Sequence, residues 1–211
     1  RVFEIRQLES RFNPHFMLNI METLRYVIPM DQALAVEATL TLSRVLKYSV
    51  YNDGDMVALR TDIDHVQDYL RLHKIRFEDR LQYTISQDRR TADMRVPKLL
   101  FQPLIENAIK HGYRNKETLS LAINAFEDEG NLVIEVLDDG GDVPEERIQA
   151  LQEAVYGEEP PAGHMGLWNI NRRLVLMYGE AHRLYIDSVN GGFYACLRIP
   201  MGFARGEMGH V

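Results

Sequence analysis

Apolar residues recur every three or four positions in the first part of the chain, a spacing that predicts helices. The first predicted helix covers about residues 4–28, with its apolar positions at Phe12, Phe16, Ile20, Leu24 and Val27. Pro14 interrupts this helix, and Pro29 is expected to end it. A proline removes one backbone donor and restricts the residue before it. A local bend at Pro14 that exposes the neighbouring His15 is a further expectation.

Two more helices follow in the same region. One is predicted over 31–51 with Asp31 as its N-cap, and residues 52–55 have the composition of a turn. The other covers about 60–77. Its charged side chains, which include Asp62 and Asp68, are expected on a solvated face. The region up to residue 82 is therefore predicted to be entirely helical.

After Arg80 the pattern changes to alternation, which is typical of strands. Strands are expected over 81–85, 119–126, 132–137, 183–189 and 193–199. Helices are expected over 97–111, 145–155 and 167–178, the first with Pro97 in its opening turn. The prediction is an α+β chain in two domains, 1–82 all-helical and 83–205 with helices between mostly antiparallel strands.

Composition limits the possible functions. The 211 residues carry a formal net charge of −7, which argues against sequence-independent binding of nucleic acid, since that requires clustered cations. The single cysteine excludes an intrachain disulfide. No stretch approaches the roughly 18 apolar residues of a membrane span, and no signal peptide is visible. The chain begins with Arg1 and is expected to be a fragment of a longer protein.

Three polar clusters in the second half carry candidate chemistry. On the 97–111 helix, the spacing places Asn107, Lys110 and His111 on one face. An amide oxygen is a suitable ligand for Mg²⁺, and the two basic side chains suit phosphates. Taken alone, such a triplet is more often an ordinary helix surface.

The other two clusters lie at a strand end and a helix start. Asp138 and Gly140 follow a buried strand, where a carboxylate can accept a hydrogen bond from the exocyclic amine of adenine. Gly163 to Leu167, with Gly166 before the leucine, open the 167–178 helix, where backbone N–H groups suit a phosphate. Each cluster alone is more simply explained by turn formation.

Together the clusters resemble the Bergerat-type ATP-binding domain shared by histidine kinases, gyrase, Hsp90 and MutL. The resemblance implies that Asn107 holds Mg²⁺, that Asp138 binds adenine, that Gly166 and Leu167 begin the phosphate-binding helix, and that residues 141–164 form a mobile lid. Two positions depart from the family pattern. Asp142 and His164 stand where glycines are common, which leaves the lid geometry open.

The first half contains Asn13-Pro14-His15-Phe16, which is close to the signature of LytS/YesM-like sensor histidine kinases. This resemblance extends over about residues 7–200. A neutral imidazole is a nucleophile at cytoplasmic pH, and Asn19, four residues later, lies on the same helix face and can orient the ring. Phe16 occupies the place where many such kinases have an acid, so Glu106 is a candidate for polarising the imidazole or a water.

The resemblance implies ATP- and Mg²⁺-dependent phosphorylation of His15, dimerisation through the front helices, and transfer of the phosphoryl group to an aspartate of a response regulator. It also implies a preceding membrane-spanning sensor, which would place this part on the cytoplasmic side of the membrane. Two alternatives stay open. One is a degenerate nucleotide-binding scaffold, and the other is an ATP-driven machine of the Hsp90 or MutL kind, although Pro103 replaces the glutamate those proteins use.

Overall fold

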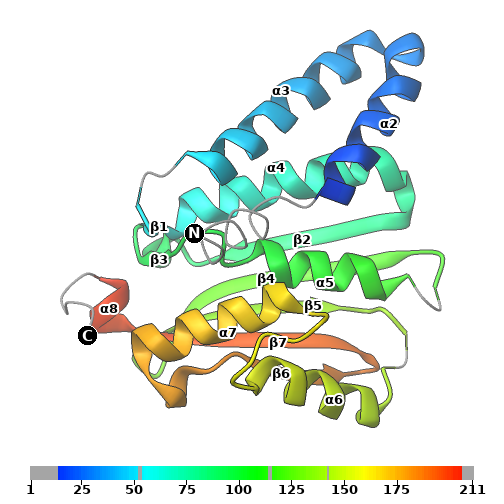
Figure 1. Cartoon of the computed structure of the whole chain (residues 1–211). Helices are drawn as coiled ribbons and strands as arrows, with labels where there is room; N and C mark the ends of the chain where they lie inside the picture. Colours follow the sequence, from blue (N-terminus) through cyan, green and yellow to red (C-terminus); the bar gives the residue numbers. More distant parts are fainter. Residues whose placement is uncertain (1–13, 52–53, 114–115, 142, 206–211) are drawn as a thin grey trace.

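The computed structural model describes residues 14–51, 54–113, 116–141 and 143–205. A helical hairpin of α2 (Pro14–Met30) and α3 (Gln32–Val50) projects from one end of the molecule (Figure 1). Helix α4 (Leu59–Phe77) lies between this hairpin and a mixed sheet, on which the remaining large helices pack. The predicted order of a helical region followed by an α+β region is confirmed, but the first region is not entirely helical, because residues 56–58 form a short strand.

The hairpin forms largely as its sequence predicts. The carboxylate of Asp31 accepts a hydrogen bond from the Leu34 N–H at 2.9 Å and so caps α3. The expectation that Pro29 ends the first helix is wrong, because α2 continues to Met30. A proline one residue before a helix end removes only one hydrogen bond, so the helix tolerates it there. The expected bend at Pro14 involves residues outside the described part and stays a prediction.

Helix α4 has the predicted extent, but one of its acids is not solvated. Asp62 is fully buried, and its carboxylate accepts hydrogen bonds from the Tyr48 hydroxyl at 2.7 Å and from the N–H groups of Leu99 and Leu100 at 2.8 and 3.0 Å. Asp68 does face outward and pairs with Arg44 at 2.6 Å. The expectation of a solvated Asp62 is wrong because its partners are far away in sequence.

The main sheet has five strands in the order β2-β4-β5-β7-β6. Their bounds are β2 (Leu81–Gln87), β4 (Leu119–Asp128), β5 (Asn131–Asp138), β6 (Tyr185–Val189) and β7 (Gly192–Pro200). Strands β2 and β4 are parallel, and the other neighbours are antiparallel. The β6–β7 hairpin turns at Asn190 and Gly191, both with positive φ, as the sequence predicts.

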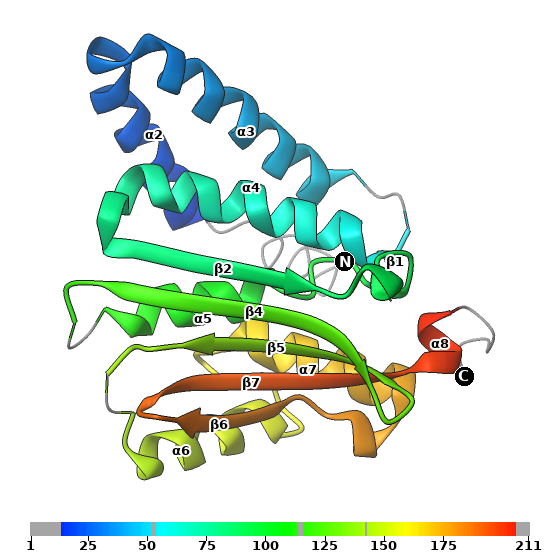
Figure 2. The ribbon, with the colours of Figure 1, turned by 180° about the vertical axis from the view of Figure 1, so that it is seen from behind.

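Three helices cover one face of this sheet, as the two opposite views show (Figures 1 and 2). They are α5 (Gln102–Gly112), α6 (Glu145–Tyr156) and α7 (Met165–Tyr178). The core between helices and sheet is formed by apolar side chains that include Leu104, Ile105, Ile123, Ile134, Leu174 and Leu197. Short elements complete the chain, namely 3-10 turns η1 (Glu78–Arg80), η2 (Arg89–Thr91) and η3 (Glu180–His182), and α8 (Met201–Ala204).

The start of α5 differs from the prediction. Pro97 ends strand β3 (Arg95–Pro97), which pairs with β1 (Met56–Ala58) in a separate two-stranded sheet. Leu99 then has φ +59°, which is incompatible with a helix, so α5 begins only at Gln102. Because β1 precedes α4 in the chain, this small sheet also ties the first half to the second.

The segment expected to be a lid is partly ordered. Residues 145–156 form α6, which packs against α7 and β6 with Ile148 and Val155 buried. The expectation of one continuous lid over 141–164 is therefore too broad. Among the described residues of this segment, 141, 143–144 and 157–164 lie in no helix or strand, and most of residues 157–164 are exposed; Asp142 lies outside the described residues.

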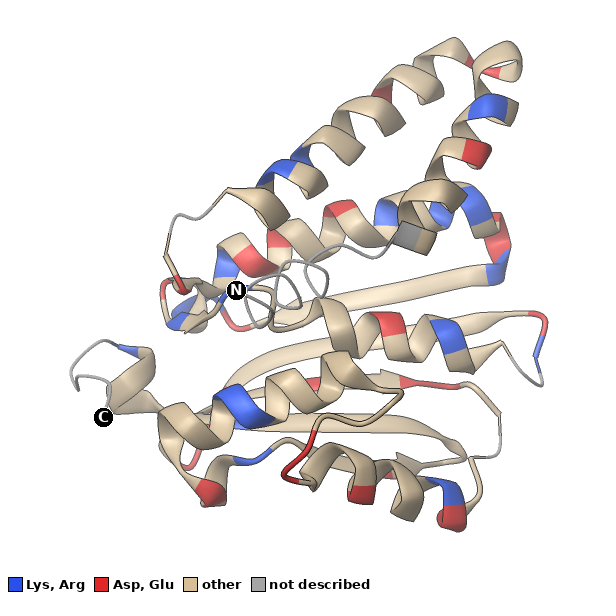
Figure 3. Cartoon of the chain, in the orientation of Figure 1, with Lys and Arg blue, Asp and Glu red and all other residues tan. Residues whose placement is uncertain are grey.

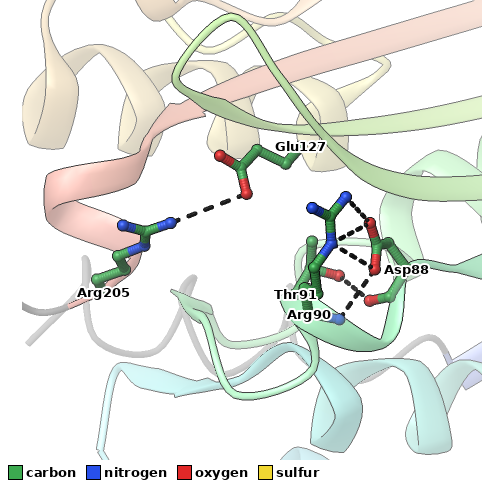
Figure 4. Close-up of polar contacts among 5 residues, drawn as sticks. All are labelled: Asp88, Arg90, Thr91, Glu127 and Arg205. Carbon is green, nitrogen blue, oxygen red and sulfur yellow. Dashed lines mark hydrogen bonds and ion pairs between the residues drawn. The ribbon is translucent and has the colours of Figure 1, made fainter.

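The surface shows two further features. Charged residues are spread over the molecule, with long uncharged stretches on α2 and α3 (Figure 3). An open depression is lined by Arg90, Asp93, Met94, Glu127 and Arg205. In it Arg90 pairs with Asp88 at 2.6 Å and Arg205 with Glu127 at 3.8 Å, so its charges are compensated (Figure 4). Among the described helices, none combines the length and the apolar character needed to cross a bilayer.

Candidate active site

The predicted acceptor histidine lies exposed at the start of α2. Its Nδ1 is 3.0 Å from the side-chain amide nitrogen of Asn19, so the predicted contact between the two side chains is present. The next residue, Phe16, is 6% exposed and stacks on the ring of Tyr69 in α4 with centroids 4.5 Å apart. Burial of Phe16 fixes this turn of α2 on α4, and His15 is presented to solvent beside it.

Helix α5 carries the second group of predicted residues. Its apolar face is buried against the sheet, which leaves Asn107 half-buried and Lys110 exposed. The Asn107 amide makes no hydrogen bond to another described residue, so its oxygen is available to a ligand. His111 faces α6 and the start of α7. Its Nδ1 is 3.3 Å from Nη2 of Arg147 in α6, and its ring centroid is 5.6 Å from that of His164.

Asp138 ends β5 in a buried position. Its Oδ1 accepts hydrogen bonds from the N–H groups of Gly140 at 2.9 Å and Phe193 at 3.1 Å, and no described residue donates to Oδ2. Burial raises the pKa of this carboxyl to about 6, although the two N–H donors oppose the shift. A carboxylate that is held by one oxygen can accept a hydrogen bond from a ligand at the other oxygen.

Close backbone contacts bring the strand end and α5 together. A Cβ on Gly140 would lie 2.6 Å from Cα of Gly112, the last residue of α5, and 2.9 Å from Oδ1 of Asp138. Only glycine permits this approach. The Asp138–Gly140 turn therefore sits directly against the end of the helix that carries Asn107.

The start of α7 meets the other end of α5. A Cβ on Gly166 would lie 2.9 Å from Cβ of Pro103, so this glycine is required by helix packing. The Leu167 side chain is 2% exposed and belongs to the core, which leaves only its backbone for ligand contact. His164 is the N-cap with φ +59°, a left-handed conformation in which its replacement of the family's glycine is strained. No side chain in the described part of the molecule caps this helix, so its first N–H groups are open to an anion.

Glu106 lies one residue before Asn107 but faces α4. Its Oε1 accepts hydrogen bonds from the Tyr69 hydroxyl at 3.3 Å and from Nε2 of Gln102 at 2.8 Å. Tyr69 and Gln102 are not among the site residues predicted from the sequence. A signal for them existed, because Asp62, His65 and Tyr69 recur at helical spacing on the face of α4 that also carries its apolar residues.

The donor set suits a hard cation held largely by a nucleotide. Within the described ranges, no group of three or more His, Cys, Asp or Glu side chains is arranged to hold a metal. One amide oxygen, that of Asn107, together with triphosphate oxygens and water fits Mg²⁺, which is usually held by few protein ligands. One predicted cluster is thus on α5 itself, and the other two lie at its ends, with Asp138 near the last residue of the helix and Gly166 near the first turn.

Comparisons with known proteins agree with this geometry. A family model described as "Histidine kinase" matches residues 3–81, and one described as "Histidine kinase-, DNA gyrase B-, and HSP90-like ATPase" matches residues 92–202. The "Sensor protein kinase HptS" of Staphylococcus aureus (strain USA300) is 31% identical over 209 residues. The match covers 99% of this chain and 40% of HptS, so the chain spans well under half of that relative.

Solved structures share the fold. The catalytic domain of the histidine kinase ThkA superposes with a TM-score of 0.50 at 16% identity, over 69% of this chain and 95% of that one. The histidine kinase domain of the blue-light activated kinase EL346 from Erythrobacter litoralis gives 0.52 at 12% identity, over 93% and 100%. The two family models and the match to HptS show that the chain belongs to the sensor histidine kinases of the LytS-like type, with a C-terminal ATPase domain of the kind shared with DNA gyrase B and HSP90.

Proposed function

We propose that this chain is the catalytic part of a two-component sensor kinase that transfers the γ-phosphoryl group of ATP to its own His15. One observation carries the proposal. An exposed histidine, held by Asn19, lies on a helix packed through α4 onto the helix that carries Asn107. In this arrangement residues 1–82 supply dimerisation and phosphotransfer, and residues 83–205 bind ATP.

The nucleotide is assigned to the surroundings of α5. Oδ2 of Asp138 accepts a hydrogen bond from the exocyclic amine of adenine, and the phosphates extend along α5 past Lys110 and His111 toward the open N–H groups of α7. Asn107 would hold Mg²⁺ together with phosphate oxygens, and the ion would neutralise charge on the triphosphate. The chain itself positions the reacting groups and supplies fixed dipoles, which is most of what phosphoryl transfer requires from a protein.

The nucleophile is assigned to Nε2 of His15, because Asn19 engages Nδ1. A half-turn of the Asn19 amide places its oxygen on Nδ1–H and leaves the lone pair on Nε2. That lone pair forms the nitrogen–phosphorus bond as the bond from γ-phosphorus to the β,γ-bridging oxygen breaks, and ADP departs with the electron pair. The Nδ1 proton then passes to water or to a nearby base. Glu106 is a candidate for that base, directly or through a water.

Exposed apolar residues on the hairpin support a homodimer. They recur at helical spacing on α2 and α3 and include Leu18, Met21, Ile28, Met30, Val36 and Leu40, each more than half exposed. Such a stripe on a soluble surface favours burial against a second copy. By family resemblance, the phosphoryl group passes from His15 to an aspartate in the receiver domain of a response regulator, and a preceding sensor segment anchors the whole protein with this part on the cytoplasmic side of the membrane.

Labelled ATP tests the proposal. The wild-type chain, incubated with γ-labelled ATP and Mg²⁺, is expected to acquire acid-labile label at His15. The His15→Gln variant is expected to bind a fluorescent ATP analogue normally but to acquire no label. The Asn107→Ala variant is expected to lose both binding and label. Normal nucleotide binding with no label on the wild-type dimer would instead favour a nucleotide-binding scaffold, and sustained ATP hydrolysis in His15→Gln would favour an ATP-driven machine.

A further inference from the structure

A line of polar side chains joins the acceptor helix to the nucleotide helix, and Glu106 is the one member of it that the proposed mechanism uses. On α4, His65 and Tyr69 are one helical turn apart and 5% and 1% exposed. They face Gln102 and Glu106, which are one turn apart on α5. Phe16 of α2 stacks on the other side of the Tyr69 ring.

The direction of each hydrogen bond follows from the chemistry of Glu106. An ionised carboxylate can only accept, so Nε2 of Gln102 and the hydroxyl of Tyr69 both donate to its Oε1. The oxygen of Gln102 is then 2.8 Å from Nε2 of His65 and needs a proton from it. Burial lowers the pKa of His65, so the ring is neutral with its proton on Nε2.

Tyr69 is the member of this line that contacts both helices. Its ring lies between Phe16, with centroids 4.5 Å apart, and His73, with centroids 4.7 Å apart and an edge-on angle of 63°. Burial, followed by the nearby charge of Glu106, raises the pKa of the Tyr69 phenol well above its usual value, so it remains a donor at neutral pH. A ring clamped on both sides has few rotamers, and a displacement of Phe16 is therefore transmitted to the hydroxyl.

We propose that Tyr69 is a positioning residue for autophosphorylation, which holds the Glu106 carboxylate in register with the helix turn that bears His15. The inference rests on the proposed function and deepens it. Phe16 follows His15 directly, and Glu106 precedes Asn107 directly. The Phe16–Tyr69–Glu106 contact thus joins the turn of the nucleophile to the turn of the proposed Mg²⁺ ligand.

The Tyr69→Phe variant isolates the hydroxyl, because it keeps the ring and its stack on Phe16. It is expected to slow single-turnover phosphorylation of His15 about tenfold, which corresponds to about 1.4 kcal/mol in the barrier. The dissociation constant for the ATP analogue is expected to change less than twofold, since Asn107 and Asp138 are untouched. Tyr178→Phe is the matched control. This tyrosine is also largely buried, its hydroxyl has no partner among the described residues, and both constants are expected within twofold of wild type.

A double-variant cycle separates positioning from general stabilisation. If the hydroxyl acts through the carboxylate, Tyr69→Phe is expected to have no further effect on the rate in a Glu106→Gln background. A lowered melting temperature with an unchanged phosphorylation rate, or additive effects of the two substitutions on that rate, overturns the inference while leaving the proposed function standing. Absence of label on the wild-type chain overturns both.

Discussion

Asp62 anchors the start of the nucleotide helix to α4, and its replacement by asparagine gives a sharp test of this structure. The carboxylate is fully buried and has four donors. Oδ1 accepts from the Tyr48 hydroxyl and the Leu99 N–H, and Oδ2 accepts from the N–H groups of Leu100 and Phe101 at 3.0 and 3.4 Å. Asparagine has the same shape but presents two N–H donors in place of one oxygen.

The magnitude follows from counting the donors left without an acceptor. If the new amide nitrogen takes the Oδ1 position, the Tyr48 hydroxyl can reverse and accept, so only Leu99 N–H loses its partner. If it takes the Oδ2 position, two N–H groups lose theirs. Each buried unsatisfied donor costs about 1–3 kcal/mol, so the loss of one or two acceptors is expected to lower the free energy of unfolding of Asp62→Asn by about 1–6 kcal/mol. That is a large share of the roughly 5–15 kcal/mol typical of a domain.

Urea unfolding followed by circular dichroism measures this loss, and Asp68→Asn on the same helix is the matched control. Asp68 pairs with the half-exposed Arg44, so its replacement is expected to cost about 1 kcal/mol or less. Because the anchored residues lead into α5, Asp62→Asn is also expected to weaken binding of the ATP analogue. A cost for Asp62→Asn no greater than that for Asp68→Asn would refute the reasoning.

Three further predictions concern single side chains. Gly140→Ala is expected to weaken binding of the ATP analogue at least tenfold, because its Cβ would lie 2.6 Å from backbone Cα of Gly112. Asp138 has a pKa of about 6 and is ionised above that pH, so nucleotide binding is expected to weaken about fourfold from pH 7.5 to 5.5 in the wild type and to change little in Asp138→Asn. Burial lowers the pKa of His73 to about 3, below the value near 6.5 expected on unfolding. Below pH 6.5 His73 is therefore protonated in the unfolded chain but stays neutral in the folded chain. The free energy of unfolding is expected to fall as pH decreases from 6.5 toward 3. Urea unfolding at pH 7.5 and 5.5 is expected to show about 1.4 kcal/mol of this loss in the wild type that is absent in His73→Leu.

Each of these has an outcome that contradicts it. Unchanged affinity in Gly140→Ala would show that the strand end does not need its close approach to α5. A pH dependence of binding that survives in Asp138→Asn would assign the titration to another group. Equal acid sensitivity of wild type and His73→Leu would show that His73 is protonated as readily in the folded chain as in the unfolded one.

The sequence by itself determined most of the elements and supplied the candidate site residues. Helical spacing and the Asp31 cap predicted the hairpin, alternation predicted the strands, and the order of the Asn107, Asp138 and Gly166 clusters indicated an ATP-binding domain. These signals are local, because each depends on residues within a few positions of one another or on the order of such segments. The contact between His15 and Asn19 was predictable for the same reason, being one turn of a single helix.

Only the tertiary structure decided the rest. Asp62 has the sequence context of a solvated acid, yet it is buried because its partners lie on other elements, Tyr48 at 14 residues away and the three backbone N–H groups at 37 to 39. The late start of α5, the packing of α6 in the helical layer and the Phe16–Tyr69–Glu106 contact likewise arise between segments that are distant in sequence. A buried polar group is stable only where its partners meet it. Where distant segments meet is a property of the folded chain, and no window of sequence contains it.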